Sequence, residues 1–296
     1  MAINPFVIAA AFVFSIIGLY FLTRIFSKTA DKIMSERPFK DIVRFKEIRS
    51  LEGTASRSGR TFLAIGEDGK NYKLHYASSL EKADEIEQNV KTIPHIFPPL
   101  LGREGSYLLF EWIGGKALIK EEDPEVIRKL GRLVADVHNL TKTSQETPDG
   151  FFIKKLNAIP EGVLNELQKE KILSRYDELK NKSKVDVVLD LHDIHSGNFK
   201  IDDNQNVLLV DEGGLGHRVK GLGIAKPLIN WFNAEQRKAF WEGYNEVHSG
   251  DYFDKDYESL VKIIESIRAI AFRVSKKQQP ETWAKEITVL REICGI

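Results

Sequence analysis

Three oxygen-bearing side chains are distinguished by their spacing in the second half of the chain. Asn198 follows Asp193 by five residues, and Asp211 follows Asn198 by thirteen. Apolar residues in 199–201 and 207–210 flank the turn-forming stretch 202–206, a pattern that predicts a β-hairpin. A hairpin folds the chain back, so we expect the three side chains to converge at its open end. Such oxygen ligands suit Mg²⁺, and a carboxylate that binds no metal can orient a hydroxyl nucleophile.

A β-rich block lies upstream of these residues. Alternating apolar and polar residues predict strands and strand-like runs, and a stripe of apolar residues at helical spacing predicts one helix. The strands are expected over 45–51, 61–65, 71–76, 98–101 and 107–112, and the helix over 80–93. This order indicates a compact α+β unit.

The loop between the first two predicted strands is rich in Gly, Ser and Thr. Gly53, Ser56 and Gly59 stand in it, and its backbone N–H groups are of the kind that close over phosphates. An ordinary polar hairpin is the alternative interpretation.

The third predicted strand and the helix after it carry the charges that a phosphate site needs. Lys73 and His75 are two residues apart and share a strand face, and Lys73 is the one that stays charged at pH 7. Glu87, with Glu85 as the alternative, is the expected carboxylate partner on the helix. Each of these residues has a plainer interpretation as a solvated surface group.

After Gly115 the sequence becomes mainly helical. The run Asp123-Pro124-Glu125 is a strong helix start, with an acidic N-cap, Pro in the first turn and a second acid. Further helices are predicted over 161–182, 234–247, 257–274 and 282–294, and a strand over 185–191.

The N-terminal segment is apolar and uncharged from residue 5 to residue 23. That length is sufficient for a helix that crosses a bilayer. Basic residues follow it, which predicts a single-pass anchor in the inner or plasma membrane with the catalytic part in the cytoplasm. A cleaved signal peptide and a buried core helix are the alternatives.

Composition excludes one class of partner. The 43 basic residues balance the 43 acidic ones, so no polyanion-binding surface is indicated and nucleic acid is not an expected partner. The single cysteine, Cys294, excludes a disulfide framework.

Residues 47–244 resemble the aminoglycoside phosphotransferase and choline kinase-like superfamily, a branch of the protein-kinase-like fold. The resemblance rests on several segments. They are 51–62, similar to the phosphate loop; 109–115, similar to the hinge; 130–138, similar to the scaffold helix; 193–198, similar to the catalytic loop; Asp211, similar to the metal-binding Asp; and 240–244, similar to a C-lobe segment.

The resemblance implies a role for each matching residue. Asp193 would orient or deprotonate the acceptor hydroxyl, Asn198 and Asp211 would hold Mg²⁺, and the hinge backbone at Glu111 and Ile113 would take the adenine of ATP. One departure is Leu191, which stands where the family usually has His.

The predicted organisation is a protein-kinase-like two-lobed α+β fold preceded by one transmembrane helix. Its parts are an anchor at 1–26, a juxtamembrane linker at 27–40, a small β-rich N-lobe at 41–113 and a larger, mainly helical C-lobe at 114–296. The predicted function is a membrane-anchored, ATP-dependent small-molecule kinase. Its acceptor would be the hydroxyl of a sugar, an amino alcohol or a lipid-linked molecule. A membrane-tethered pseudokinase is the alternative. A protein kinase, or a kinase of the ubiquinone-biosynthesis type, ranks lower because the segments typical of those classes are missing from the sequence.

Overall fold

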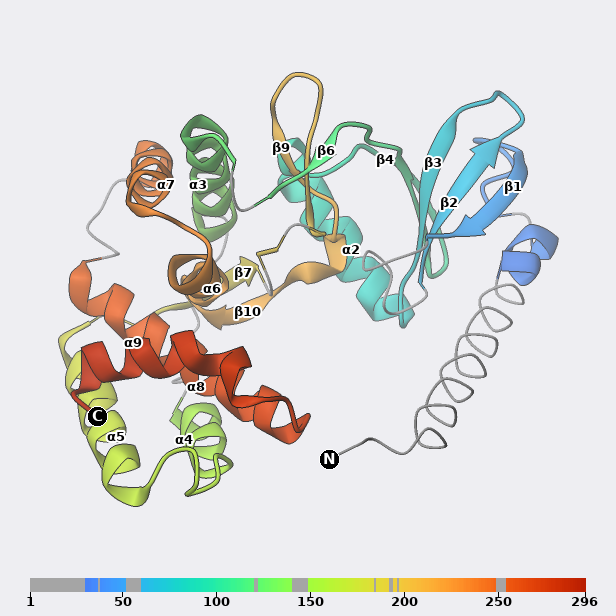
Figure 1. Ribbon diagram of the computed structural model, residues 1–296. Helices are drawn as coiled ribbons and strands as arrows, with labels where there is room; N and C mark the ends of the chain where they lie inside the picture. Colours follow the sequence, from blue (N-terminus) through green and yellow to red (C-terminus); the bar gives the residue numbers. More distant parts are fainter. Residues whose placement is uncertain are drawn as a thin grey trace, which may run out of the picture. The chain divides into compact units, whose positions relative to one another are not determined.

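The computed structural model describes most of the chain after residue 29. The described residues are 30–36, 38–51, 60–119, 122–139, 149–183, 185–191, 194–195, 197–248 and 254–296. Their contacts form two compact units, and the division falls between Ile113 and Gly114 (Figure 1).

The N-terminal unit is an antiparallel sheet with one long helix. The sheet order is β1-β2-β3-β5-β4. Its strands are β1 (Phe45–Ser50), β2 (Thr61–Gly66), β3 (Asn71–Tyr76), β4 (Leu100–Glu104) and β5 (Tyr107–Glu111), and the helix is α2 (Leu80–Thr92). The Ser79 side chain caps α2 by accepting a hydrogen bond from the N–H of Lys82 at 3.1 Å. The predicted α+β character of this unit is confirmed.

Apolar residues of 30–36 and 38–43 pack into the core of this unit, where the sequence predicts a linker. Residues 30–36 are helical, and the side chains of Ile33 and Phe39 are fully buried. They pack in one cluster with Phe62, Leu74 and Leu109 from the sheet. The polar residues between them had suggested a linker over 27–40. The few apolar side chains of this segment pack against the sheet instead, and their burial places the segment in the core.

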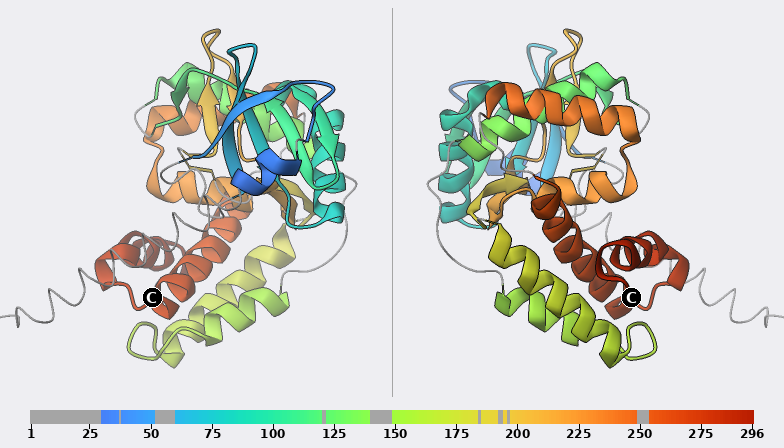
Figure 2. Two further views of the ribbon diagram at one scale, coloured as in Figure 1. Left: turned by 90° about the vertical axis from the view of Figure 1, so that its right-hand side faces the viewer. Right: turned by 90° about the vertical axis from the view of Figure 1, so that its left-hand side faces the viewer.

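The C-terminal unit is mainly helical, with two small antiparallel sheets. One sheet pairs β7 (Val187–Leu191) with β10 (Leu215–Val219), and the other has the order β6 (Lys116–Ala117), β8 (Phe199–Ile201), β9 (Val207–Leu209). The helices are α3 (Pro124–Asn139), α4 (Asp149–Asn157), α5 (Glu166–Lys182), α6 (Leu222–Asn230), α7 (Ala234–Val247), α8 (Lys255–Ser275) and α9 (Ala284–Cys294). Helices α4, α5 and α9 pack against α8, as Figure 2 shows, and a large cluster of buried apolar residues lies among them.

Several of these elements differ from the sequence expectation. The predicted helices α3, α5, α7, α8 and α9 are present, but β6, β10, α4 and α6 were not predicted. Helix α6 contains Pro227 and follows a glycine-rich stretch, two features that normally argue against a helix. Contacts with its neighbours therefore outweigh the local preference.

Two glycines allow α3 and α7 to lie side by side (Figure 1). A Cβ added at Gly131 on α3 would lie 2.1 Å from the carbonyl oxygen of Phe240 on α7. In the same way, a Cβ at Gly243 on α7 would lie 1.9 Å from the carbonyl oxygen of Arg128 on α3. The two backbones are in direct contact, so neither position has room for a side chain.

Replacing Gly243 with alanine is expected to lower the free energy of unfolding by about 2 kcal/mol, because the added methyl group must push two backbones apart. Urea unfolding followed by circular dichroism measures the loss. Gly150 on α4 is the matched control, since a Cβ there would meet nothing within 4 Å. Gly150→Ala should leave stability unchanged or raise it slightly. Equal losses in the two variants would contradict the close-packing explanation.

The predicted membrane localisation is contradicted. Among the residues that the structure describes, no helix combines the length and the apolar character needed to span a bilayer. The longest described helix, α8, has 21 residues but carries Lys262, Glu265 and Arg268 within it. The predicted anchor, residues 5–23, lies outside the described residues.

Candidate active site

The loop between β7 and β8 carries the predicted catalytic motif. Asp193 lies outside the described residues. Around it, Ile194 is buried, and the N–H of Gly197 donates a hydrogen bond to Nδ1 of His195 at 2.9 Å. The N–H of Asn198 donates to the carbonyl oxygen of His195 at 3.0 Å, which closes a tight turn. His195 therefore shapes the loop through both its side chain and its backbone.

The predicted hairpin is confirmed, and it brings Asn198 next to Asp211. Strands β8 and β9 pair antiparallel, with Phe199 opposite Leu209. Beyond that pair, the N–H of Val210 donates to the carbonyl oxygen of Asn198 at 2.8 Å. Asp211 is the next residue after Val210, so both predicted metal ligands lie at the open end of the same hairpin.

The turn after the hairpin holds Asp211 in a defined position. Its carbonyl oxygen accepts a hydrogen bond from the N–H of Gly214 at 2.9 Å. A Cβ at Gly214 would lie 3.0 Å from Oδ2 of Asp211, so the carboxylate lies against the glycine backbone. A larger residue at position 214 would push this carboxylate away.

The two predicted ligands fit magnesium as it is bound in nucleotide sites. Mg²⁺ is commonly held there by one or two protein groups together with phosphate oxygens. Among the described residues, no three His, Cys, Asp or Glu side chains form a metal-binding cluster. One carboxylate, Asp211, and one amide, Asn198, are the kind of protein groups that bind Mg²⁺ in such a site.

Lys73 and His75 on β3 differ in the charge they can carry. Desolvation lowers the pKa of the half-buried His75 to about 3, and the positive charge of Lys73 is the next contribution. His75 is therefore neutral at pH 7, with its Nδ1 atom 3.3 Å from the hydroxyl of Thr61. Lys73 is buried, and its Nζ atom lies 5.7 Å from the centre of the Phe110 ring. The assignment of Lys73 rather than His75 as the cation that holds phosphates stays a prediction.

The predicted carboxylate partners on α2 have other cations close by. Glu87 accepts a hydrogen bond from Arg103 on β4 at 2.8 Å and forms an ion pair with Lys91 at 2.7 Å. Glu85 forms an ion pair with Lys82 at 2.7 Å. The pairing of Lys73 with Glu87 stays a prediction.

Of the other residues predicted to contact the nucleotide, the structure describes Glu111 and Ile113. Gly53, Ser56 and Gly59 lie outside the described residues. Glu111 ends β5 and donates its N–H to the carbonyl oxygen of Pro99 at 2.9 Å. Ile113 follows it as the last residue of the N-terminal unit and is half-buried.

Sequence reasoning missed a buried acid close to the catalytic loop. Asp190 is fully buried in β7, an otherwise apolar strand, and its carboxylate lies 3.0 Å from Nε2 of His138 on α3. A single acid among the apolar residues of Val187–Leu191 was the signal that could have revealed it, because a buried charge requires a partner.

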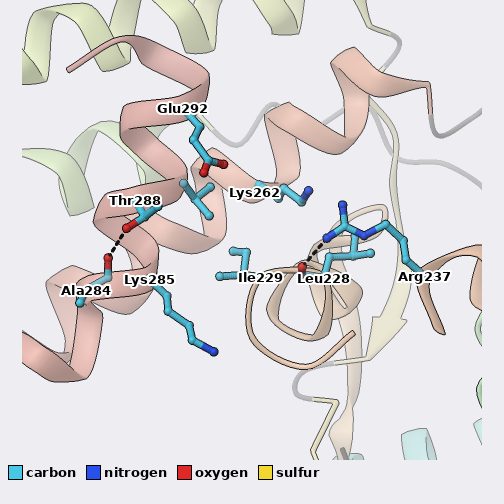
Figure 3. A pocket seen from close by; sticks show the side chains of 9 residues that line it. Leu228, Ile229, Arg237, Lys262, Ala284, Lys285, Thr288 and Glu292 are labelled. Carbon is cyan, nitrogen blue, oxygen red and sulfur yellow. Dashed lines mark hydrogen bonds between the residues drawn. The ribbon is translucent and has the colours of Figure 1, made fainter. Parts of the chain in front are cut away.

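A pocket of about 390 Å³ lies elsewhere in the C-terminal unit, lined by α6, α7, α8 and α9 (Figure 3). Arg237 donates there to the carbonyl oxygen of Leu228 at 2.9 Å and to Glu258 at 3.2 Å. Lys262 also forms an ion pair with Glu258. The carboxylate of Glu258 therefore offsets part of the positive charge of Arg237 and Lys262 in this pocket. None of the predicted site residues lines the pocket.

Comparison with known proteins gives matches only at the level of structure. No protein-family model and no curated protein sequence matches the chain. Among solved structures, choline kinase LicA from Streptococcus pneumoniae is similar with a TM-score of 0.62 and 14% identity, over 88% of this chain and 99% of that one. The same kinase is also known in complex with AMP.

Two phosphotransferases of antibiotics are similar as well. The aminoglycoside phosphotransferase of Alicyclobacillus acidocaldarius has a TM-score of 0.59 and 13% identity, over 83% of this chain and 91% of that one. The macrolide 2'-phosphotransferase MphH of Brachybacterium faecium has a TM-score of 0.60 and 11% identity, over 90% and 97%. At these identities the comparisons show the fold: the chain has the protein-kinase-like fold that the resemblance predicted, which choline kinases and aminoglycoside phosphotransferases share.

Proposed function

We propose that the chain is an ATP-dependent kinase of small molecules. It would transfer the γ-phosphate to a hydroxyl group of a sugar or an amino alcohol. The observation that carries this proposal is the hydrogen bond from Val210 to Asn198, because it brings an amide and a carboxylate together where a nucleotide-bound metal needs both. The similar structures, which include choline and aminoglycoside kinases, support the same reaction class.

In the proposed reaction Asp193 accepts the proton of the acceptor hydroxyl, or orients that hydroxyl while its proton leaves. The acceptor oxygen then forms a bond to the γ-phosphorus, the bond from that phosphorus to the bridging oxygen breaks, and ADP departs with the electron pair. Mg²⁺ held by Asn198 and Asp211 would neutralise charge on the phosphates. Positioning and charge neutralisation account for most of the catalysis in such a transfer.

The N-terminal unit would supply the remaining contacts with the nucleotide. Lys73, which is buried, would hold the α- and β-phosphates, because a neutral His75 offers them no positive charge. The loop with Gly53, Ser56 and Gly59 would cover the phosphates, and the backbone at Glu111 and Ile113 would bind adenine.

One observation favours a second candidate, a nucleotide-binding pseudokinase. Glu87 lies within ion-pair distance of Arg103 and Lys91, whereas an active kinase of this fold uses the corresponding Glu to hold the phosphate-binding Lys. Leu191 in place of the family's His points in the same direction.

A transfer assay distinguishes the two candidates. The protein is incubated with Mg²⁺ and γ-labelled ATP, and choline, ethanolamine and an aminoglycoside are offered in turn as acceptors. We expect labelled phosphate on at least one of these hydroxyl acceptors. Thermal stabilisation by ATP without label on any acceptor would favour the pseudokinase. Neither stabilisation nor transfer would contradict both candidates.

A further inference from the structure

The Asp190 carboxylate joins three elements of the C-terminal unit by hydrogen bonds. Its Oδ1 accepts hydrogen bonds from Nε2 of His138 at 3.0 Å and from the N–H of Leu191 at 2.7 Å. Its Oδ2 accepts a hydrogen bond from the N–H of Gly223 at 3.0 Å. Asp190 is on β7, His138 is in the last turn of α3, and Gly223 is in the first turn of α6.

Asp190 also serves as the cap of α6. The residue at the N-cap position, Gly221, has a φ of 80° and no side chain with which to accept a hydrogen bond. The carboxylate from β7 accepts the N–H of Gly223 instead, and the positive end of the helix favours its negative charge. A Cβ at Gly223 would lie 2.3 Å from the carbonyl oxygen of Leu191, so the helix start lies directly on the end of the strand.

His138 connects this carboxylate to α7. Its side chain is fully buried, and because a carboxylate only accepts hydrogen bonds, Nε2 must donate to Asp190. The other ring nitrogen, Nδ1, lies 2.9 Å from the hydroxyl of Tyr244. Burial alone would raise the pKa of Asp190, but the interaction with His138 and the bond from Gly223 outweigh it and lower that pKa.

We propose that Asp190 and His138 are positioning residues, which hold the peptide at Leu191 in place so that the chain presents Asp193 for phosphoryl transfer. The proposal rests on the function proposed above for Asp193, which follows Leu191 by two residues. The side chain of Leu191 is apolar and buried, so it provides no polar anchor itself. The acid one residue earlier provides the polar anchor here.

Hydrogen exchange tests the anchor without reference to activity. In Asp190→Ala, the amides of Leu191 and Gly223 should exchange at least tenfold faster relative to the amide of Val188 on the same strand. The control is Ile267→Ala, which removes a buried side chain of α8 and should speed exchange of all three amides alike. Unchanged relative rates at Leu191 and Gly223 in Asp190→Ala would overturn the proposal.

Kinetics test the consequence for transfer. Asp190→Ala should lower kcat by about 100-fold with the KM for ATP unchanged, because a displaced catalytic group slows the reaction without weakening nucleotide binding. Asp190→Asn keeps an oxygen that can accept from His138 and Leu191 but sets its NH₂ group against the N–H of Gly223, so it should recover only part of kcat. A kcat for Asp190→Ala equal to that of Ile267→Ala would also overturn the proposal. If the wild type transfers no phosphate, the proposed function fails, and hydrogen exchange alone decides whether the anchor exists.

Discussion

Asp193→Ala is expected to lower kcat for phosphoryl transfer by about a thousandfold while ATP still binds. The variant removes the group that would orient the acceptor hydroxyl and take its proton, and such groups contribute about 10²- to 10⁴-fold. Nucleotide contacts come from other residues, so the dissociation constant for Mg·ATP should change less than threefold. Transfer of labelled phosphate and calorimetric titration with Mg·ATP measure the two quantities.

Asp203→Ala is the matched control for this variant. Asp203 lies in the exposed turn between β8 and β9, on the same hairpin but at the end away from Asn198. It should retain the wild-type kcat. If Asp193→Ala retained it as well, the base would have to be sought elsewhere. A joint loss of transfer and of ATP binding would point to misfolding of the loop rather than to chemistry.

Asp211→Asn is expected to abolish the dependence of the reaction on magnesium and to lower kcat by about a thousandfold. Stabilisation of phosphate charge by a metal amounts to several kcal/mol, and each 1.36 kcal/mol corresponds to a tenfold change in rate. The asparagine keeps the shape that lies against Gly214, so the turn should stay intact. Only the charge on the predicted ligand is removed.

Titration with magnesium separates this effect from a general loss of activity. In the wild type, Mg²⁺ should tighten ATP binding, and removing the metal with EDTA should stop transfer. In Asp211→Asn, ATP affinity should be the same with and without Mg²⁺. A wild-type response to Mg²⁺ in this variant would show that Asp211 is not a ligand. Asp203→Ala, with the wild-type response expected, serves again as the control.

The local features of the site were readable from the sequence. The hairpin was predicted because apolar residues flank a turn-rich stretch, and both signals act over a few residues. The start of α3 was equally clear from Asp123-Pro124-Glu125, since the structure begins that helix at Pro124. These features depend on neighbouring residues, so a single sequence contains the information that they need.

The membrane prediction, in contrast, is contradicted by the structure. It relied on one apolar run, and the helices that the structure describes do not meet the requirements for a membrane span. The packing of Ile33 and Phe39 into the N-terminal core likewise depends on a sheet formed by later residues. Local hydrophobicity cannot reveal which surface such side chains will cover.

The sequence by itself determined the spacing of Asp193, Asn198 and Asp211, the hairpin that brings Asn198 next to Asp211, and most of the helices. Only the tertiary structure showed that burial lowers the pKa of His75 and disfavours its charged form, because burial depends on how the strands and their neighbours pack. It likewise brought Arg103 to Glu87, and His138 to Asp190. The partners in each pair lie on different elements and are joined by packing rather than by sequence spacing, so their contacts exist only once the chain has folded.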